Sequence, residues 1–205
     1  MVKVYGDLIS GNCYKIKLLL ELLSIEHEWV DIDILEGETQ TPDFLAKNPN
    51  GKVPIVELSD GRILAESNAI LCFFAQDSNY LPTDNYLKAK VLSWLFFEQY
   101  SHEPYIAVAR YINLYLGLPD DRKAEYESKQ EGGHKALKVI EDTLKQSAYL
   151  VGAKLTIADI SLFAYTHVAH QGGFDLYDYP NIKNWIARIE TTTGFISMDK
   201  AKSSH

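Results

Sequence analysis

The order of the expected secondary-structure elements changes near residue 80, and this change limits the possible folds more than any other feature. Apolar and polar residues alternate in segments 2–6 and 27–34, which predicts two strands, and an amphipathic helix is expected over 11–24. Further along, VPIVEL and RILAE flank SDG, which predicts an antiparallel hairpin. A short helix should precede this hairpin and another should follow it. Only helical patterns follow, so the order is βαβ-α-ββα and then helices.

This order predicts the fold class. A helical crossover between parallel strands is right-handed in nearly all proteins, so the first two strands should be parallel neighbours. The hairpin then completes a small mixed sheet with helices on both faces, which is a thioredoxin-like arrangement. We predict a thioredoxin-like α/β domain over residues 1–77, a linker over 78–85 and an all-α domain over 86–205. Within the last, Pro104 should kink or divide a long helix, and Gly132–Gly133 should weaken the next one.

Charge and composition exclude several classes of function. The net charge of −8 disfavours binding to nucleic acid or to an anionic membrane, both of which require a basic face. The apolar runs are much shorter than the roughly 20 residues of a membrane span, and the N-terminus lacks a signal-peptide layout. Two cysteines are too few for a disulfide framework. We therefore expect a reduced, cytoplasmic protein without nucleic-acid or membrane partners.

Three motifs occur in order along nearly the whole chain. A serine ends the first strand and is followed by CYKIKLLLELL, then NPNGKVPIVEL with LAESNAI downstream, and finally LTIADISLF in the helical half. Together they resemble the cytosolic glutathione transferase family, in particular its serine-type, theta- and zeta-like bacterial members. The resemblance implies an enzyme that conjugates the thiolate of glutathione, its co-substrate, to small hydrophobic electrophiles, without a metal. It also implies a homodimer and a role in detoxification.

The resemblance further implies which residues bind glutathione. Val53–Pro54 is expected to be a cis peptide bond that presents the backbone of Val53 to an extended peptide. Ser67 should bind the γ-glutamyl carboxylate, and it is also a natural N-cap at a helix end that attracts anions. Glu66 should attract the γ-glutamyl ammonium. Lys52 either reaches the glycyl carboxylate or remains solvated.

Three neighbouring residues are candidates for the residue that acts on the thiol of glutathione. Lowering the pKa of a thiol from about 8.5 by two units requires about 2.7 kcal/mol of preferential stabilisation of the thiolate. A hydroxyl at a helix N-terminus supplies a charge-assisted hydrogen bond together with the helix dipole. Ser10 lies at such an end, and the resemblance puts the active serine of theta and zeta transferases there. Asn12 is a candidate auxiliary donor, as in transferases that act mainly on disulfides. Cys13 is expected to pack inside the helix as a small apolar residue.

The resemblance assigns the electrophile site to the first long helix of the helical domain. Core packing is the alternative role for most of its candidates, which are Tyr100, His102, Tyr105, Ala109 and Arg110. Gln99 is a candidate for completing the γ-glutamyl site of the partner subunit.

The TIAD segment has a structural role. Thr156 and Asp159 match the spacing of a capping box, which begins a buried helix correctly. We expect Thr156→Ala to lower the free energy of unfolding by about 1 kcal/mol, measurable by chemical denaturation.

Two functions of other classes fit the same motifs. The first is glutathione-dependent reduction of peroxides or disulfides, and the second is a non-catalytic binding module built on a glutathione transferase-like scaffold. Intact Ser10, Pro54, Glu66 and Ser67 argue against the second.

Overall fold

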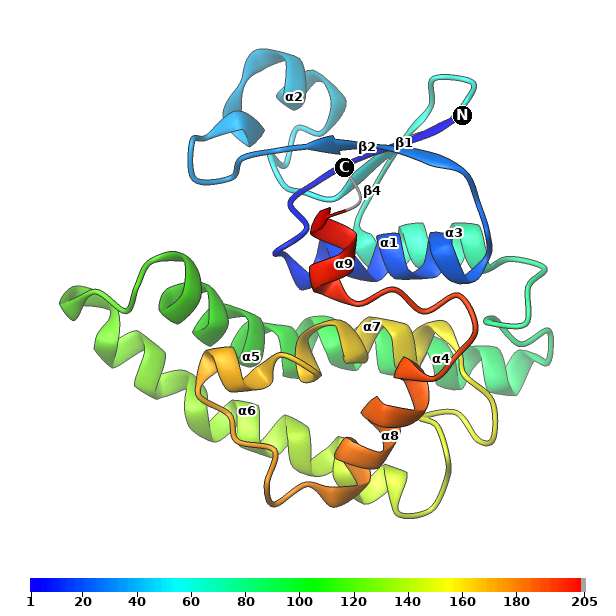
Figure 1. The fold of residues 1–205 in the computed structure, drawn as a ribbon, viewed down its shortest axis with the longest axis vertical. Helices are drawn as coiled ribbons and strands as arrows, with labels where there is room; N and C mark the ends of the chain where they lie inside the picture. The colour runs from blue at the N-terminus through cyan, green and yellow to red at the C-terminus, as the bar shows by residue number, and fades with distance from the viewer. Residues whose placement is uncertain (204–205) are drawn as a thin grey trace. The chain divides into compact units, whose positions relative to one another are not determined.

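The computed structural model describes residues 1–203, which form two compact units (Figure 1). The first unit contains residues 1–76 and the segment that begins at Thr192, and the second runs from Asp77 to Thr191. The helical unit therefore ends at Thr191, whereas the sequence predicted that it continues to residue 205.

The first unit contains a mixed sheet of four strands, in the order β2-β1-β3-β4. β1 is parallel to β2, and the other pairs are antiparallel, as the crossover rule and the hairpin signal predicted. The thioredoxin-like fold of this half is thus confirmed. The strands are β1 (Val2–Gly6), β2 (His27–Asp31), β3 (Ile55–Glu57) and β4 (Ile63–Ala65).

Helices cover both faces of this sheet. α1 (Gly11–Leu22) and α3 (Ser67–Ala75) lie side by side on one face, and the short α2 (Pro42–Lys47) lies on the other (Figure 1). A 3-10 turn, η1 (Glu38–Gln40), precedes α2. Fully buried apolar side chains of β1, β3, α1 and α3 form the core of the unit, among them Val4, Leu18, Leu20, Val56, Ile70 and Leu71.

The C-terminal segment packs on α1 within the first unit. The Tyr14 hydroxyl donates a hydrogen bond of 2.8 Å to the carbonyl oxygen of Ile196. The last helix, α9 (Met198–Ser203), contacts α1, and its Ala201 is fully buried. Six residues are too few to show a helical period, so the sequence did not predict this helix.

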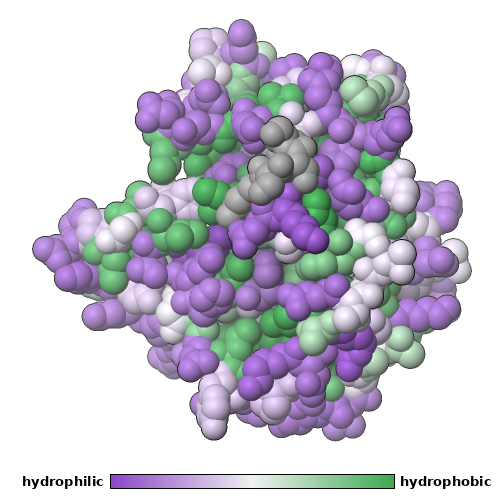
Figure 2. Space-filling view, viewed as in Figure 1, coloured by the Kyte–Doolittle hydropathy of each residue, from purple (hydrophilic) through white to green (hydrophobic). Residues whose placement is uncertain are grey.

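The second unit is helical, as predicted, and π-turns interrupt its longest continuous run of helical residues. Among residues 1–203, no helix combines the length and the apolar character that a membrane span needs. On the face drawn in Figure 2, hydrophilic residues predominate and the apolar ones form separate patches. The elements are α4 (Asn85–Phe97), η2 (Glu98–His102), α5 (Glu103–Arg110), η3 (Tyr111–Tyr115), η4 (Asp120–Arg122), α6 (Lys123–Leu144), α7 (Ile157–Thr166), η5 (Ala169–Gly172) and α8 (Pro180–Glu190).

Pro104 divides the long helix through a π-turn. It lies in the first turn of α5, directly after the π-helix η2. The N–H of Glu103 donates to the carbonyl of Glu98, five residues earlier. A proline ring clashes with the carbonyl four residues before it, and the wider π-turn moves this carbonyl away. The long helix is therefore divided into α4, η2 and α5, while the chain stays helical on both sides of Pro104.

The capping box at the start of α7 is confirmed. The backbone N–H and the hydroxyl of Thr156 each donate to Oδ2 of Asp159 at 2.9 Å.

Gly132 and Gly133 are sites of close packing in α6, which continues through both residues. A Cβ atom on Gly132 would overlap the ring of Tyr105, and one on Gly133 would overlap the ring of Phe174. Neighbouring side chains thus fill the space that the missing side chains leave.

We expect Gly133→Ala to destabilise the protein although alanine is the better helix former. Phe174 is fully buried and its ring would overlap the added methyl group, which should therefore cost about 1–3 kcal/mol through overpacking. The gain in helix propensity is about 1 kcal/mol. Gly132→Ala is the matched control, because the half-buried Tyr105 ring can move toward solvent and the loss should be smaller. Urea unfolding would contradict this account if both variants gained stability.

Candidate active site

Ser10 is the N-cap of α1 and ends the loop that follows β1. Its N–H donates to the carbonyl of Asp7 at 2.9 Å, and its own carbonyl accepts the first helical hydrogen bond, from the N–H of Tyr14. The Asp7 side chain also accepts from the N–H of Ile9 at 2.8 Å, which tightens the loop. The Ser10 side chain is half-buried and makes no capping hydrogen bond to the helix backbone. A hydroxyl therefore lies at the positive end of a helix without capping it.

Cys13 is a buried thiol one turn into α1. Its sulfur packs closely against Gly6, where an added Cβ atom would lie 3.0 Å from it. Burial raises the pKa of Cys13 to about 12. Smaller effects lower this pKa, and the largest of them is the hydrogen bond with the Ser10 side chain. Cys13 thus packs as the sequence predicted. The Ser10 hydroxyl thus interacts with Cys13 in this structure.

We expect Cys13 to resist thiol reagents in the folded protein. With a pKa of about 12, about one Cys13 in 10⁴ is ionised at pH 8. Above about pH 8.5 the unfolded chain releases this proton while the folded chain keeps it, so stability should fall as the pH rises toward 12. In a Cys72→Ser variant, dithionitrobenzoate should label the chain at pH 8 only after denaturation. Rapid labelling of the folded variant would contradict the burial of Cys13.

The first turns of α1 and α3 are joined by two hydrogen bonds between side chains. The Ser67 hydroxyl donates to Oδ1 of Asn12 at 3.2 Å, and Nζ of Lys15 donates to Oδ1 of Asn68 at 3.0 Å. The structure therefore brings two predicted site residues, Asn12 and Ser67, into contact. Because both helices begin here, their N–H groups and positive dipole ends lie close together.

The start of α3 differs from the prediction by one residue. Ser67 is the first helical residue, and the N-cap is Glu66, whose carbonyl accepts from the N–H of Ile70. Glu66 is exposed and has a φ of 67°, a left-handed conformation that is uncommon outside glycine. Ser67 lies inside the first turn, and its hydroxyl binds Asn12 of the neighbouring helix.

The loop before β3 contains the expected cis peptide bond, Val53–Pro54. Asn48 holds this loop by donating from Nδ2 to the carbonyl of Lys52 at 2.8 Å, and Nε2 of Gln40 donates to the carbonyl of Gly51 at 3.2 Å. The Lys52 side chain is exposed. Within residues 1–203, no hydrogen bond to either backbone group of Val53 is found.

Sequence reasoning missed Lys15 and Asn68. Lys15 is fully buried, although lysine is usually exposed. A signal was present, because Lys15 lies within the mainly apolar run YKIKLLL. Its partner could not be predicted, since the contact joins residues 53 positions apart.

Three of the predicted electrophile-site residues are buried in the helical unit. His102 and Ala109 are fully buried, and Arg110 is 2% exposed. Nε2 of His102 lies 2.9 Å from the Thr166 hydroxyl, and Nε of Arg110 donates to Oε1 of Gln171 at 2.7 Å. Core packing, the alternative considered for these residues, describes them correctly.

Tyr100 and Tyr105 have accessible surface. Tyr100 is 87% exposed, and the neighbouring Gln99 is exposed and donates to Oε2 of Glu98 at 2.8 Å. The two tyrosines line a cavity of about 270 Å³ with Phe97, Ser101, Gly132, Lys135, Ala136 and Val139.

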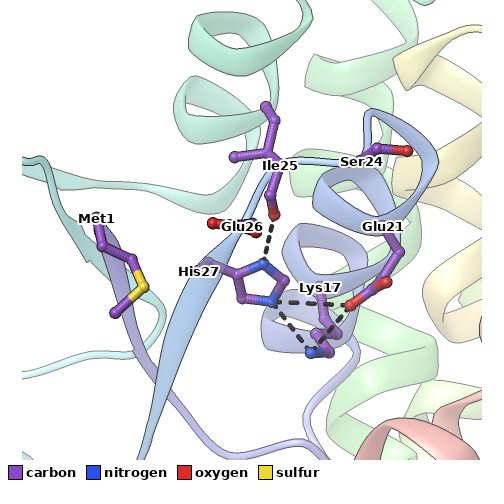
Figure 3. A pocket seen from close by; sticks show the side chains of 7 residues that line it. All are labelled: Met1, Lys17, Glu21, Ser24, Ile25, Glu26 and His27. Atoms are coloured by element: carbon purple, nitrogen blue, oxygen red, sulfur yellow. Dashed lines mark hydrogen bonds and ion pairs between the residues drawn. The ribbon is translucent and has the colours of Figure 1, made fainter.

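A second polar cluster lies at the other end of α1 (Figure 3). Nζ of Lys17 is 3.0 Å from Nε2 of His27 and 3.1 Å from Oε1 of Glu21. Nδ1 of His27 lies 2.8 Å from the carbonyl oxygen of Ile25, to which it donates because a carbonyl can only accept. These residues border a cavity of about 510 Å³. The cluster ties α1 to the start of β2.

The fold and the site define a class of protein. A thioredoxin-like unit with a serine at the start of α1 precedes an all-helical unit, which is the arrangement of two-domain, thiol-dependent transferases. The family model "Glutathione S-transferase, N-terminal domain" matches residues 9–77, and "Glutathione S-transferase, C-terminal domain" matches residues 80–192. The chain belongs to the glutathione S-transferase family.

Individual relatives agree with this assignment. A crystal structure of a glutathione S-transferase from Pseudomonas fluorescens Pf-5 is 57% identical, with a TM-score of 0.95 over 96% of this chain and 98% of that one. A probable glutathione S-transferase of Oryza sativa subsp. japonica is 32% identical over 92% of this chain and 90% of its own length. The disulfide-bond oxidoreductase YfcG of Escherichia coli (strain K12) is 30% identical over 89% and 87%. The first two of these relatives are named glutathione S-transferases and support an enzyme with transferase activity.

Proposed function

We propose that this transferase conjugates glutathione to small hydrophobic electrophiles and that the Ser10 hydroxyl stabilises the glutathione thiolate. The observation that carries the proposal is the position of Ser10, a half-buried N-cap whose hydroxyl makes no bond to the helix backbone. After rotation away from Cys13, the hydroxyl donates to the sulfur, and the dipole of α1 favours the same negative charge. Asn12 is an auxiliary donor.

The chemical step is nucleophilic attack by this thiolate. The thiol of bound glutathione loses its proton to water, and the sulfur forms a bond to an electrophilic carbon. With an aryl chloride, chloride leaves with the electron pair of the broken carbon–chlorine bond. With an activated double bond, the carbanion that forms takes a proton from water. Such conjugation serves detoxification in a cytoplasmic setting.

The glutathione backbone is proposed to bind across the first unit. The γ-glutamyl carboxylate binds Ser67 and the N–H groups that begin α3, and Glu66 attracts the ammonium. The backbone of Val53, beside Pro54, pairs with the cysteinyl residue. The exposed Lys52 reaches the glycyl carboxylate. The contact between Asn12 and Ser67 supports this arrangement, because it brings a thiol-site candidate to the carboxylate site.

The electrophile is proposed to contact Tyr100 and Tyr105, whose rings line a cavity and offer apolar faces with hydroxyl tips. The buried His102, Ala109 and Arg110 are left out of this site.

The active form is proposed to be a homodimer. Phe96 of α4 is 70% exposed, Tyr100 is 87% exposed and Phe73 of α3 is 45% exposed, and a second copy of the chain would cover such apolar surface. The exposed Gln99 would then complete the γ-glutamyl site of the partner subunit. Light scattering across a concentration series checks the dimer.

Calorimetry and a substrate panel together test the function. Glutathione should bind to the unmodified chain, and chlorodinitrobenzene should be conjugated only when glutathione is present. Cumene hydroperoxide and hydroxyethyl disulfide, assayed separately, measure the alternative reductase activity. Absence of glutathione binding would contradict the proposal and favour a non-catalytic module.

The reductase alternative has one specific observation in its favour. Asn12 lies at the junction of α1 and α3, and the similar Escherichia coli protein is named a disulfide-bond oxidoreductase. A panel in which disulfide reduction greatly exceeds conjugation would support it.

A further inference from the structure

Lys15 carries a positive charge into the interior of the first unit. Its side chain is fully buried in α1, and its Nζ donates to Oδ1 of Asn68 at 3.0 Å. Removing an ammonium from water is costly even when hydrogen bonds and ion pairs compensate. Methionine has a similar length and would fill this place without that cost. Packing alone therefore does not explain a lysine here.

The bond to Asn68 fixes the first turn of α3. Asn68 directly follows Ser67, and an ammonium can only donate, so the amide oxygen of Asn68 faces Lys15 and its NH₂ group faces the opposite side. The bond between Asn12 and Ser67 lies beside it. Lys15 thus orients a side chain in the same turn to which the γ-glutamyl carboxylate is proposed to bind.

The positive charge of Lys15 and the N-terminal end of α3 both attract a carboxylate. The N–H groups that begin α3 carry partial positive charge, and an ammonium beside them adds to the potential that a carboxylate meets there. In a partly buried site such an interaction persists over several ångströms, because the effective dielectric constant is about 20 rather than 80.

We propose that Lys15 is a positioning residue for the γ-glutamyl carboxylate of glutathione, which it favours by holding Asn68 and by its charge. Lys15 does not touch the carboxylate, which binds Ser67 and the N–H groups of α3. This inference rests on the proposed function, because it requires that glutathione binds at this turn.

Paired peptides test the inference. Glutathione is compared by calorimetry with γ-aminobutyryl-cysteinyl-glycine, which lacks only the γ-glutamyl carboxylate. Lys15→Met should weaken glutathione binding about 10-fold and change the affinity of the analogue less than about 2-fold. Lys15→Arg keeps the charge and should restore most of the affinity for glutathione.

Lys17 offers a matched control. It lies on the same helix, is 6% exposed and pairs with Glu21 and His27 on another face of α1 (Figure 3). Lys17→Met also removes a buried lysine, but its contacts to Glu21 and His27 lie away from α3, so the affinities for both peptides should stay unchanged.

Asn68→Ala keeps the inference testable if Lys15→Met does not fold. It removes one hydrogen-bond acceptor of Lys15 and should selectively weaken binding of glutathione, as Lys15→Met should. Equal losses for the two peptides in either variant would overturn the inference, because they would indicate a general structural role. If the unmodified chain bound no glutathione, the proposed function itself would fail before any variant is compared.

Discussion

Replacing Ser10 by alanine is expected to lower kcat/KM for conjugation of chlorodinitrobenzene about 100-fold at pH 6.5 and saturating glutathione. A hydrogen bond to an ionised group contributes about 1.5–3 kcal/mol, and its loss returns the pKa of the bound thiol toward about 8.5. The loss of activity should therefore shrink as the pH rises, because above pH 9 the thiol ionises without help. An ultraviolet titration of bound glutathione measures this pKa directly.

Two variants control this experiment. Ser10→Thr keeps a hydroxyl and should retain most of the activity. Cys13→Ala removes the buried thiol that contacts Ser10 and should not reduce the rate, because Cys13 is not ionised at working pH. An unchanged pH profile in Ser10→Ala would contradict the assignment of Ser10. If Asn12→Ala were the more damaging variant and disulfide reduction the activity lost, the reductase alternative would replace the proposal.

The fold could be predicted where the signal is local. The strand alternation of 2–6, the hairpin around SDG and the capping box of Thr156 and Asp159 each depend on residues within a few positions, and all three appear in the structure. The helical character of the second half was predicted in the same way, from the repeated spacing of its apolar residues. Topology then followed from the handedness of the crossover.

The site could be predicted only in part, because its contacts join distant segments. Ser10 was proposed from its place before α1 and from the family resemblance, and its role stays a prediction. The bonds from Ser67 to Asn12 and from Lys15 to Asn68 depend on how α1 and α3 pack, which no local pattern encodes.

Asp159 has the largest expected effect on stability, because four donors converge on its fully buried carboxylate. Oδ1 accepts from the N–H of Leu150 at 2.8 Å and from Nε1 of Trp185 at 2.9 Å. Oδ2 accepts from the N–H and the hydroxyl of Thr156, both at 2.9 Å. Burial raises the pKa of Asp159, and these hydrogen bonds act in the opposite direction. One side chain thus joins α7, the loop before it and α8.

Asp159→Ala is expected to lower the free energy of unfolding by about 3–5 kcal/mol, measured by urea denaturation. The reason is that two backbone N–H groups and the indole of the buried Trp185 lose their acceptor, and each unsatisfied donor costs about 1–3 kcal/mol. Asp159→Asn keeps the acceptor for Leu150 and Trp185 but turns an NH₂ group toward the N–H of Thr156, so it should lose about 2 kcal/mol. Thr156→Ala removes one donor and leaves the carboxylate in place, so its loss should be the smallest of the three. If Asp159→Ala lost no more stability than Thr156→Ala, the carboxylate would not be the centre of this network.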